Sequence, residues 1–199
     1  RRDIVAVNPT NRLVERDEAL LASTGAVRRL VDGYAALAAP LAAQVVGAIA
    51  ADLPAHAVDT ACNMPAGELI ADAQRAATGA DIAFMNRGGV RSPGFTVASS
   101  PAGEGDGRVT YGEAFTVQPF GNSLVTMTLT AQQIKDVLEQ QFVGCLGQGT
   151  QRIMQISNGF AYTWNAANAA CAKIVDVSFT PTDGTLNPPL VTGPTENLV

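Results

Sequence analysis

The clearest helical pattern in the first quarter of the chain runs from Gly25 to Ala39. Its apolar side chains recur at intervals of three and four residues, as on one face of an amphipathic helix. They are Val27, Leu30, Val31, Tyr34, Leu37 and Ala38. We expect Pro40 to interrupt or restart this helix, after which the apolar stretch LAAQVVGAIAADL continues to Leu53. The pattern therefore predicts a largely helical segment over residues 26–53.

Two further helices are indicated by the residues at their ends. Pro65 suits the first turn of a helix and Gly79 suits the position just beyond its end, so residues 65–78 should be helical. Thr130 and Gln133 have the spacing of a capping box, in which two side chains satisfy the free N–H groups of a helix start. The helix after Thr130 should bury four apolar side chains, those of Ile134, Val137, Leu138 and Phe142.

Short apolar or alternating segments predict extended chain between and after these helices. ADIAFM (80–85) is typical of a buried strand, and VTYGEAFTVQPF (109–120) of extended chain. In SLVTMTL (123–129) apolar and polar residues alternate, which predicts a half-buried strand. Three more extended segments follow: RIMQIS (152–157), GFAYTW (159–164), whose aromatic residues share one face, and KIVDVSF (173–179).

Composition narrows the classes of function. The chain has 199 residues, of which 47% are hydrophobic and only 16% charged, with a net charge of -5. An acidic chain is a poor partner for nucleic acid, and no apolar run approaches the length of a transmembrane helix. The chain begins abruptly with RRDIVAVNP and without a signal peptide, so we expect it to be the interior or the processed product of a longer protein.

The three cysteines, Cys62, Cys145 and Cys171, leave two interpretations open. Their spacing matches no zinc motif, and His56 is the single histidine of the sequence. Either all three are buried thiols, or the protein is secreted and carries one disulfide. Cys145 and Cys171 are then the best pair, because each lies in a Gly/Ala-rich loop beside a strand-like segment.

The familiar catalytic motifs are missing from the sequence. It contains no G-x-x-x-x-G-K-[ST] phosphate loop and no G-x-S-x-G nucleophile motif. A binuclear metal hydrolase needs several histidine and aspartate ligands, and one histidine cannot build such a site in the usual way. We therefore expect no catalytic residues and no metal site in this chain.

Two polar loops remain as candidate binding residues. In MNRGGVRSPG (85–94), Asn86 follows a strand, Gly88 and Gly89 expose backbone N–H groups, and Arg91 supplies a guanidinium. The double glycine is expected to need at least one positive φ. In VQPFGNS (117–123), Pro119 and Gly121 bend the chain, so that Phe120 can leave the core beside Asn122. An exposed ring near polar groups suits an aromatic base on a sugar, although both loops could equally be plain turns.

Three segments resemble the C-terminal domain of the 5′-nucleotidase and UDP-sugar hydrolase family. They are NMPAGELIADAQRAA, AFMNRGGVRSP and VTYGEAFTVQPFGNSLVTMTLTAQQIKDVLEQQF, in matching order and spacing. The resemblance is closest over residues 67–160 and extends back to VNPTNRLVERD and APLAAQVVGAIAADL, which resemble segments linking the family's metallophosphoesterase domain to this one.

The resemblance implies a fold and a division of labour. The fold is α+β, a mixed sheet flanked by helices and preceded by a helical linker. Residues 1–54 would form the linker from an absent N-terminal metallophosphoesterase domain, which holds two divalent metal ions and cleaves the phosphoester. Residues 55–199 would bind the nucleoside part of the substrate. By position, Asn86 and Arg91 would hold ribose, Gly88 and Gly89 would allow close approach, Phe120 would stack on the base and Asn122 would contact its edge.

Two departures from the family pattern bear on affinity. Thr60 and Asn63 stand near the places where the family often has an arginine and a glutamate. The family also completes its pocket with a second aromatic residue and an aspartate near the C-terminus, and TENLV (195–199) resembles only the start of that segment. We expect a pocket with one wall missing, which binds weakly.

The parent protein is expected to be a secreted, periplasmic or cell-surface 5′-nucleotidase. A UDP-sugar hydrolase or a 2′,3′-cyclic nucleotide hydrolase is an alternative, because this domain mainly recognises the nucleoside, which these substrates share. A non-catalytic surface module for adhesion or nucleoside capture is the alternative from another class. For the hydrolase the expected partners are the nucleoside or nucleotide substrate and the N-terminal metallophosphoesterase domain, with no nucleic acid and no membrane span in this chain.

Overall fold

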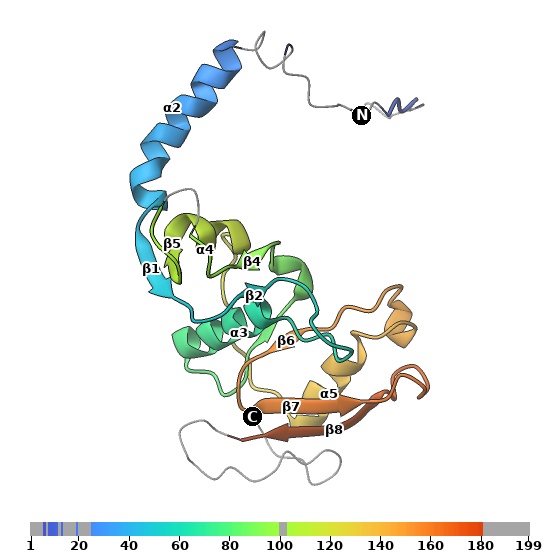
Figure 1. Cartoon of the computed structure of the whole chain (residues 1–199). Coiled ribbons are helices and arrows are strands. Elements are labelled where there is room, and N and C mark those ends of the chain that lie inside the picture. The colour runs from blue at the N-terminus through green and yellow to red at the C-terminus, as the bar shows by residue number, and fades with distance from the viewer. Residues whose placement is uncertain are drawn as a thin grey trace. The chain divides into compact units, whose positions relative to one another are not determined.

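The computed structural model describes residues 25–99 and 103–180 continuously and, before them, only residues 6, 8–11, 13 and 19. The chain divides into two compact units, residues 1–41 and 42–199. The predicted boundary between residues 54 and 55 stays a prediction. The segment TENLV lies outside the described residues. Helices and short strands alternate along the second unit, which is an α+β fold as predicted (Figure 1).

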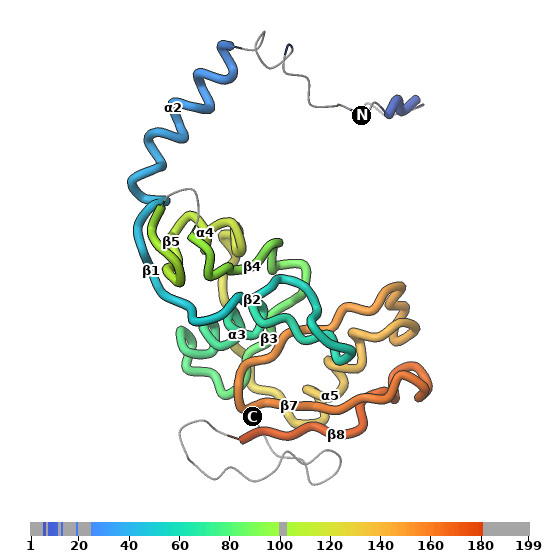
Figure 2. Tube along the Cα trace, viewed as in Figure 1, coloured from blue at the N-terminus to red at the C-terminus, as the bar shows by residue number. Residues whose placement is uncertain are grey.

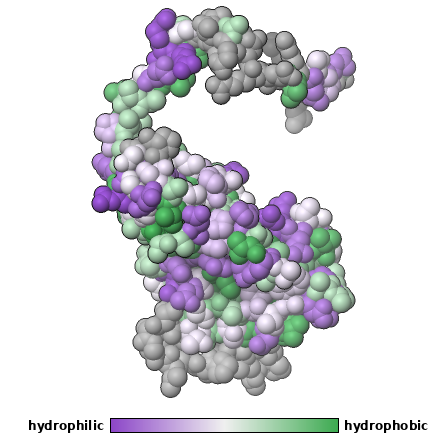
Figure 3. All heavy atoms as spheres, in the orientation of Figure 1, coloured by the Kyte–Doolittle hydropathy of each residue, from purple (hydrophilic) through white to green (hydrophobic). Residues whose placement is uncertain are grey.

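Helix α2 (Gly25–Ala42) confirms the first helical pattern, but Pro40 does not interrupt it. Pro40 lies in the last turn of the helix, where its fixed φ fits a helical backbone and only two residues follow. The apolar side chains of α2 are exposed, and pale green spheres mark this helix in Figure 3. No helix in the described part of the chain is long and apolar enough to cross a membrane.

The expected helical character up to Leu53 is wrong. Residues 45–48 form strand β1 (Val45–Ala48), which pairs antiparallel with β5 (Arg108–Thr110). The β-branched residues Val45 and Val46 favour a strand, and pairing with β5 decided between helix and strand. Strand β2 (Leu53–Pro54) pairs with β4 (Gly94–Phe95). Gly94 has a φ of 92°, and a Cβ at that position would overlap the carbonyl oxygen of Leu53, so the pairing needs glycine.

The segment predicted as extended chain over residues 109–120 contains a helix instead. Helix α4 (Tyr111–Val117) begins at a capping box. The Glu113 N–H donates to the Thr110 hydroxyl at 3.3 Å, and the Thr110 N–H donates to the Glu113 carboxylate at 2.8 Å. The T-x-x-E spacing of Thr110 and Glu113 is the sequence signal of this helix start.

Helix α3 (Pro65–Thr78) and strands β3 (Phe84–Met85) and β6 (Gln155–Ile156) each adjoin in sequence a residue that lines the cavity described below. The predicted ends of α3 are confirmed: Pro65 is its first residue, and Gly79 follows it in the left-handed conformation. Strand β3 pairs antiparallel with β6, Met85 opposite Gln155. Gln155 is buried, accepts a hydrogen bond from the Met64 N–H at 2.6 Å and donates to the Cys62 carbonyl at 3.1 Å. One side chain thus joins β6 to the segment that leads into α3.

Helix α5 (Ala131–Glu139) packs on the hairpin of β7 (Phe160–Trp164) and β8 (Ile174–Phe179), which run side by side in Figure 2. The capping box of Thr130 and Gln133 is confirmed. Ile134, Leu138 and Phe142 are buried as expected, but Val137 is 37% exposed. Cys145 and Cys171 form a disulfide, which confirms the predicted pair, and Cys62 is free.

The expected half-buried strand over residues 123–129 is wrong. These residues belong to no strand, and the side chains of Leu124, Val125 and Met127 are exposed. The described strands form four separate antiparallel pairs, and none of these pairs includes residues 123–129. The alternating pattern alone could not supply the partner that burial requires.

Candidate functional site

The first predicted loop leaves β3 through a tight turn. Residues Arg87–Gly89 form a 3₁₀ helix, in which the Gly89 N–H donates to the Asn86 carbonyl at 3.0 Å. Neither glycine has a positive φ, so the expectation of a left-handed residue in this turn is wrong. The β6 pairing holds Met85 in place and so fixes where the turn begins.

The two glycines of this loop differ in what they require. A Cβ on Gly89 would lie 2.5 Å from Met85 Cε and 3.2 Å from Asn86 Oδ1, so close packing explains this glycine. A Cβ on Gly88 would have its nearest neighbour, Asn86 Nδ2, at 3.7 Å, which is an ordinary contact. Gly89 is therefore needed by the packing of its own loop, whereas Gly88 lies open on the cavity surface.

Arg91 brings the two predicted loops together. Its backbone N–H donates to the Val117 carbonyl at the end of α4, at 2.9 Å. Its guanidinium carbon lies 5.0 Å from the centre of the Phe120 ring, which is within the range of a cation–π contact. The Phe120 ring is 38% exposed and therefore has surface left for a ligand. Asn122 is exposed and makes no hydrogen bond with another described residue.

A cavity of about 500 Å³ opens beside this loop. From the predicted set, Asn86, Gly88 and Arg91 line it, while Gly89, Phe120 and Asn122 do not. The volume lies within the range of about 300–1,000 Å³ typical of small-molecule sites. The cavity lining does not test whether Phe120 or Asn122 contacts a ligand, so these two contacts stay predictions.

Sequence reasoning missed two arginines of the same cavity. Arg87 lies in the same loop as Arg91, and Arg152 lies just before β6, far away in the sequence. The Arg152 Nε donates to the Thr150 hydroxyl at 3.1 Å. Only the pairing of β3 with β6 brings residues 150–152 to the loop after β3, and no local pattern reports such a pairing.

Asn63, at one of the departures from the family pattern, is engaged within its own turn. Its side-chain Nδ2 donates to Asp59 Oδ2 at 2.8 Å, and its backbone N–H donates to Asp59 Oδ1 at 3.1 Å. The backbone hydrogen bond from Asn63 is the main cause that lowers the pKa of Asp59. In this arrangement Asn63 holds a turn and does not reach toward the large cavity.

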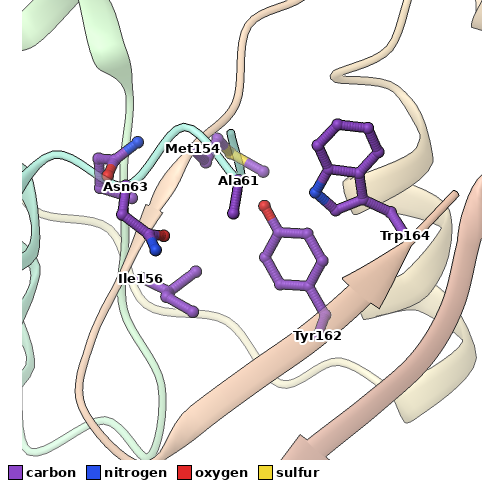
Figure 4. A pocket seen from close by; sticks show the side chains of 7 residues that line it. Ala61, Asn63, Met154, Ile156, Tyr162 and Trp164 are labelled. Atoms are coloured by element: carbon purple, nitrogen blue, oxygen red, sulfur yellow. The ribbon is translucent and has the colours of Figure 1, made fainter. Parts of the chain in front are cut away.

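A second, smaller hollow lies between the Ala61–Asn63 segment and β7. Figure 4 shows the Tyr162 hydroxyl directed toward Ala61, with the Trp164 ring beside it. Burial raises the pKa of Tyr162, whose hydroxyl accepts a hydrogen bond from Gln141 at 3.2 Å. At about 50 Å³ this hollow is far below the size of a nucleoside site. The larger cavity is therefore the candidate ligand site.

The polar groups that line the cavity are suited to binding a ligand. No group of three or more histidine, cysteine, aspartate or glutamate side chains among the described residues is placed to hold a metal ion. The cavity presents amide and guanidinium groups beside an aromatic ring. Such groups donate hydrogen bonds and stack, but none is a nucleophile.

Comparisons with known proteins agree with this fold. The family model described as 5′-nucleotidase, C-terminal domain matches residues 45–190. Endonuclease YhcR of Bacillus subtilis is 27% identical over 179 residues, 90% of this chain and 13% of that protein. Trifunctional nucleotide phosphoesterase protein YfkN of the same organism is 34% identical over 122 residues, 61% of this chain and 8% of that protein.

A solved structure shares the architecture. The crystal structure of a 5′-nucleotidase precursor from Thermus thermophilus superposes with a TM-score of 0.62 and 25% sequence identity, covering 86% of this chain and 31% of that chain. The present chain thus spans a small fraction of the length of each of these proteins.

Proposed function

Because the chain belongs to the 5′-nucleotidase C-terminal domain family, we propose that it is the nucleoside-recognising part of a longer nucleotide hydrolase. One observation carries this proposal: the guanidinium of Arg91 lies over the Phe120 ring at the edge of a cavity that Asn86 also lines. Two loops distant in sequence therefore supply an aromatic face and polar donors at one place.

These groups match the chemistry of a nucleoside. A planar base gains from stacking on an aromatic ring, and ribose hydroxyls pair with amide and guanidinium groups. We assign Phe120 to the base, Asn86 and Arg91 to the ribose, Gly88 and Gly89 to the approach of the ligand, and Asn122 to the base edge. Gly89 serves this role indirectly, because a side chain there would collide with Met85 and displace the loop.

Cleavage belongs to another part of the parent protein in this proposal. Two divalent metal ions, expected in an N-terminal metallophosphoesterase domain, would polarise the phosphoester and activate water. The described residues of this chain include no cluster of side chains that could hold those ions, so no catalytic step is assigned to these residues. Two relatives, YhcR and YfkN, are named for an endonuclease and a nucleotide phosphoesterase. This agrees with a nucleotide phosphoester as the substrate class.

The disulfide supports a location outside the reducing cytosol. Cys145 and Cys171 are bridged, and disulfides persist mainly in secreted, periplasmic and surface proteins. We therefore propose that the parent protein is exported.

A titration of this chain with adenosine tests the binding assignment. We expect weak, millimolar-range binding to the wild type and a further loss in Arg91→Ala, because a hydrogen bond to a charged group contributes roughly 1.5–3 kcal/mol. Arg108→Ala is the matched control, since Arg108 is an exposed arginine of β5 that does not line the cavity. Wild-type affinity in Arg91→Ala, or a lower melting temperature without any change in affinity, would rule out the assignment.

A second measurement tests the division of labour. The pure chain with Mn²⁺ or Mg²⁺ should release no phosphate from AMP or UDP-glucose beyond the rate of a buffer control. Metal-dependent turnover by this chain would overturn the proposal that cleavage lies elsewhere.

A further inference from the structure

The connection between β6 and β7 is a tight turn with an asparagine–glycine pair at its centre. The Phe160 N–H donates to the Ser157 carbonyl at 3.3 Å, which closes the turn around Asn158 and Gly159. Gly159 has a φ of 92°, a value that suits glycine at the third position of a four-residue turn. Asn158 is exposed, so water reaches its side chain. No other asparagine of the sequence is followed by glycine.

Two groups of this turn have no partner among the described residues. The Asn158 backbone N–H donates to Asp72 Oδ1 at 2.6 Å, but the Asn158 side-chain amide makes no hydrogen bond with a described residue. The Gly159 carbonyl accepts from the Thr180 N–H at 2.7 Å, whereas the Gly159 N–H donates to no described residue. The main chain is thus anchored on both sides of the pair, while the Asn158 side chain and the Gly159 nitrogen are free to react with each other.

Glycine is the residue that most favours a reaction between these two groups. A side chain on the following residue would crowd the approach of its nitrogen to the asparagine side-chain carbonyl carbon, and glycine has no side chain. An asparagine amide that is held by a neighbour must also break that hydrogen bond before it reacts. Neither obstacle is present at Asn158 and Gly159 in the described chain.

We propose that Asn158 is a site of spontaneous deamidation in the folded protein. The Gly159 nitrogen gives its proton to hydroxide and forms a bond to the side-chain carbonyl carbon of Asn158. The bond from that carbon to Nδ2 breaks, and Nδ2 takes a proton from water and leaves as ammonia. The two residues are then joined in a succinimide ring.

Water opens this ring in one of two ways. When the bond from the Gly159 nitrogen to the side-chain carbon breaks, the product is an aspartate in a normal main chain. When the bond from the same nitrogen to the main-chain carbon breaks, the product is an isoaspartyl linkage. The net change consumes water and releases ammonia, and nothing is oxidised or reduced.

The product adds a negative charge to an acidic neighbourhood. The partner of the Asn158 N–H is the carboxylate of Asp72. Burial, together with the charges of Asp59 and Asp72, already raises the pKa of Glu68. A further carboxylate beside Asp72 repels the charge of Asp72, so deamidation should weaken this turn.

Ser157 extends the effect to the pairing of β3 with β6. Its N–H donates to the Ala83 carbonyl at 3.0 Å, and its hydroxyl accepts from the Ala83 N–H at 2.9 Å. An isoaspartyl linkage adds a carbon atom to the main chain directly after Ser157. We therefore expect deamidation to loosen the corner of the fold where β3 and β6 meet.

Mass spectrometry that resolves individual residues tests the proposal. The purified chain is incubated at pH 8 and digested at intervals, and each deamidation appears as a mass gain of about 1 Da. Asn122 is a control, because it is also exposed with an unbound side chain among the described residues, but Ser123 follows it. Asn168 is a second control, since its Nδ2 donates to the Ala172 carbonyl at 3.1 Å. We expect Asn158 to convert at least roughly tenfold faster than either control.

The same incubation in urea separates the effect of the fold from that of the dipeptide. The unfolded chain gives the rate of this asparagine–glycine pair without tertiary structure. We expect the folded protein to convert within roughly tenfold of that rate, because the described fold does not engage the reacting groups. An Asn158 that stays intact in the folded protein but converts in urea would overturn the proposal. Equal rates at Asn122 and Asn158 in the folded protein would overturn the role given to Gly159.

Two variants complete the test. Asn158→Gln keeps an amide whose longer side chain closes the ring far more slowly, so conversion at this position should be lost. Asn158→Asp supplies the product and should have a lower urea midpoint than Asn158→Gln at pH 7. The difference should disappear at pH 3, where the added carboxyl is protonated. Equal midpoints at pH 7 would overturn the expected weakening of the turn.

Discussion

The guanidinium of Arg91 lies over one face of the Phe120 ring, with 5.0 Å between the guanidinium carbon and the ring centre. A ligand base therefore has to stack on the ring surface that remains open or extend the stack over the guanidinium. Either arrangement depends on the aromatic face, because an aliphatic side chain of similar size has no π surface to offer.

Phe120→Leu tests this dependence while keeping an apolar side chain. We expect adenosine affinity to fall by roughly 1–3 kcal/mol, the range for stacking of one base on an aromatic side chain. The melting temperature should change little, because the ring is 38% exposed. Phe115→Leu is the control, since Phe115 is an exposed phenylalanine of α4 whose ring stacks with Tyr111, whereas the Phe120 ring contacts Arg91 of the cavity. Undiminished affinity in Phe120→Leu would remove Phe120 from the site.

Gln155→Leu should destabilise the fold around the cavity. The buried side chain of Gln155 satisfies the Met64 N–H and the Cys62 carbonyl. Each buried group left without a partner costs about 1–3 kcal/mol. Urea unfolding should show a lower midpoint, whereas Gln140→Leu, at an exposed position beyond α5, should stay near the wild type. Equal midpoints for the two variants would contradict the role given to Gln155.

Thiol titration and a paired substitution test the disulfide. The denatured, unreduced protein should contain one reactive thiol per chain, that of Cys62. Replacing both Cys145 and Cys171 by alanine should lower the free energy of unfolding by about 3 kcal/mol, because the bridge closes a loop of 26 residues in the unfolded chain. Three reactive thiols would show a reduced protein and would count against an exported parent.

Tyr162 predicts a loss of stability at alkaline pH. Burial raises the pKa of Tyr162 above the ordinary value of 10.0. Above pH 10 the unfolded chain therefore gives up a proton that the folded chain retains, so stability falls as the pH rises through this window. Tyr162→Phe should be less stable than the wild type at pH 8, where it loses the hydrogen bond from Gln141. The gap should narrow as the pH rises above 10, and parallel pH profiles of the two proteins would refute the effect of burial.

Helix ends were the features most accessible from sequence, because a cap depends on residues three or four positions apart. Thr130 with Gln133 and Pro65 with Gly79 placed the starts or ends of two helices correctly. The same chemistry at Thr110 and Glu113 would have identified α4 had the T-x-x-E spacing been applied there. The prediction that the aromatic residues of β7 share one face was also correct, because side chains two residues apart in a strand point to the same side.

Strand pairing was decided by the tertiary structure. Residues 45–48 became a strand through β5, whereas residues 123–129 carry a strand pattern but pair with no described strand. A strand needs hydrogen bonds from a second segment, and its own sequence does not name that segment.

The sequence by itself determined which residues the binding loops contain, and through the order of its motifs it indicated the family to which the chain belongs. The tertiary structure alone decided that Arg91 would cover the Phe120 ring and that Arg152 would join Arg87 at the cavity. The reason is that these contacts depend on the pairing of β3 with β6 and on the packing of α4 beside the β3 loop. Such contacts join segments distant in sequence, whose mutual approach follows from the burial of the whole core.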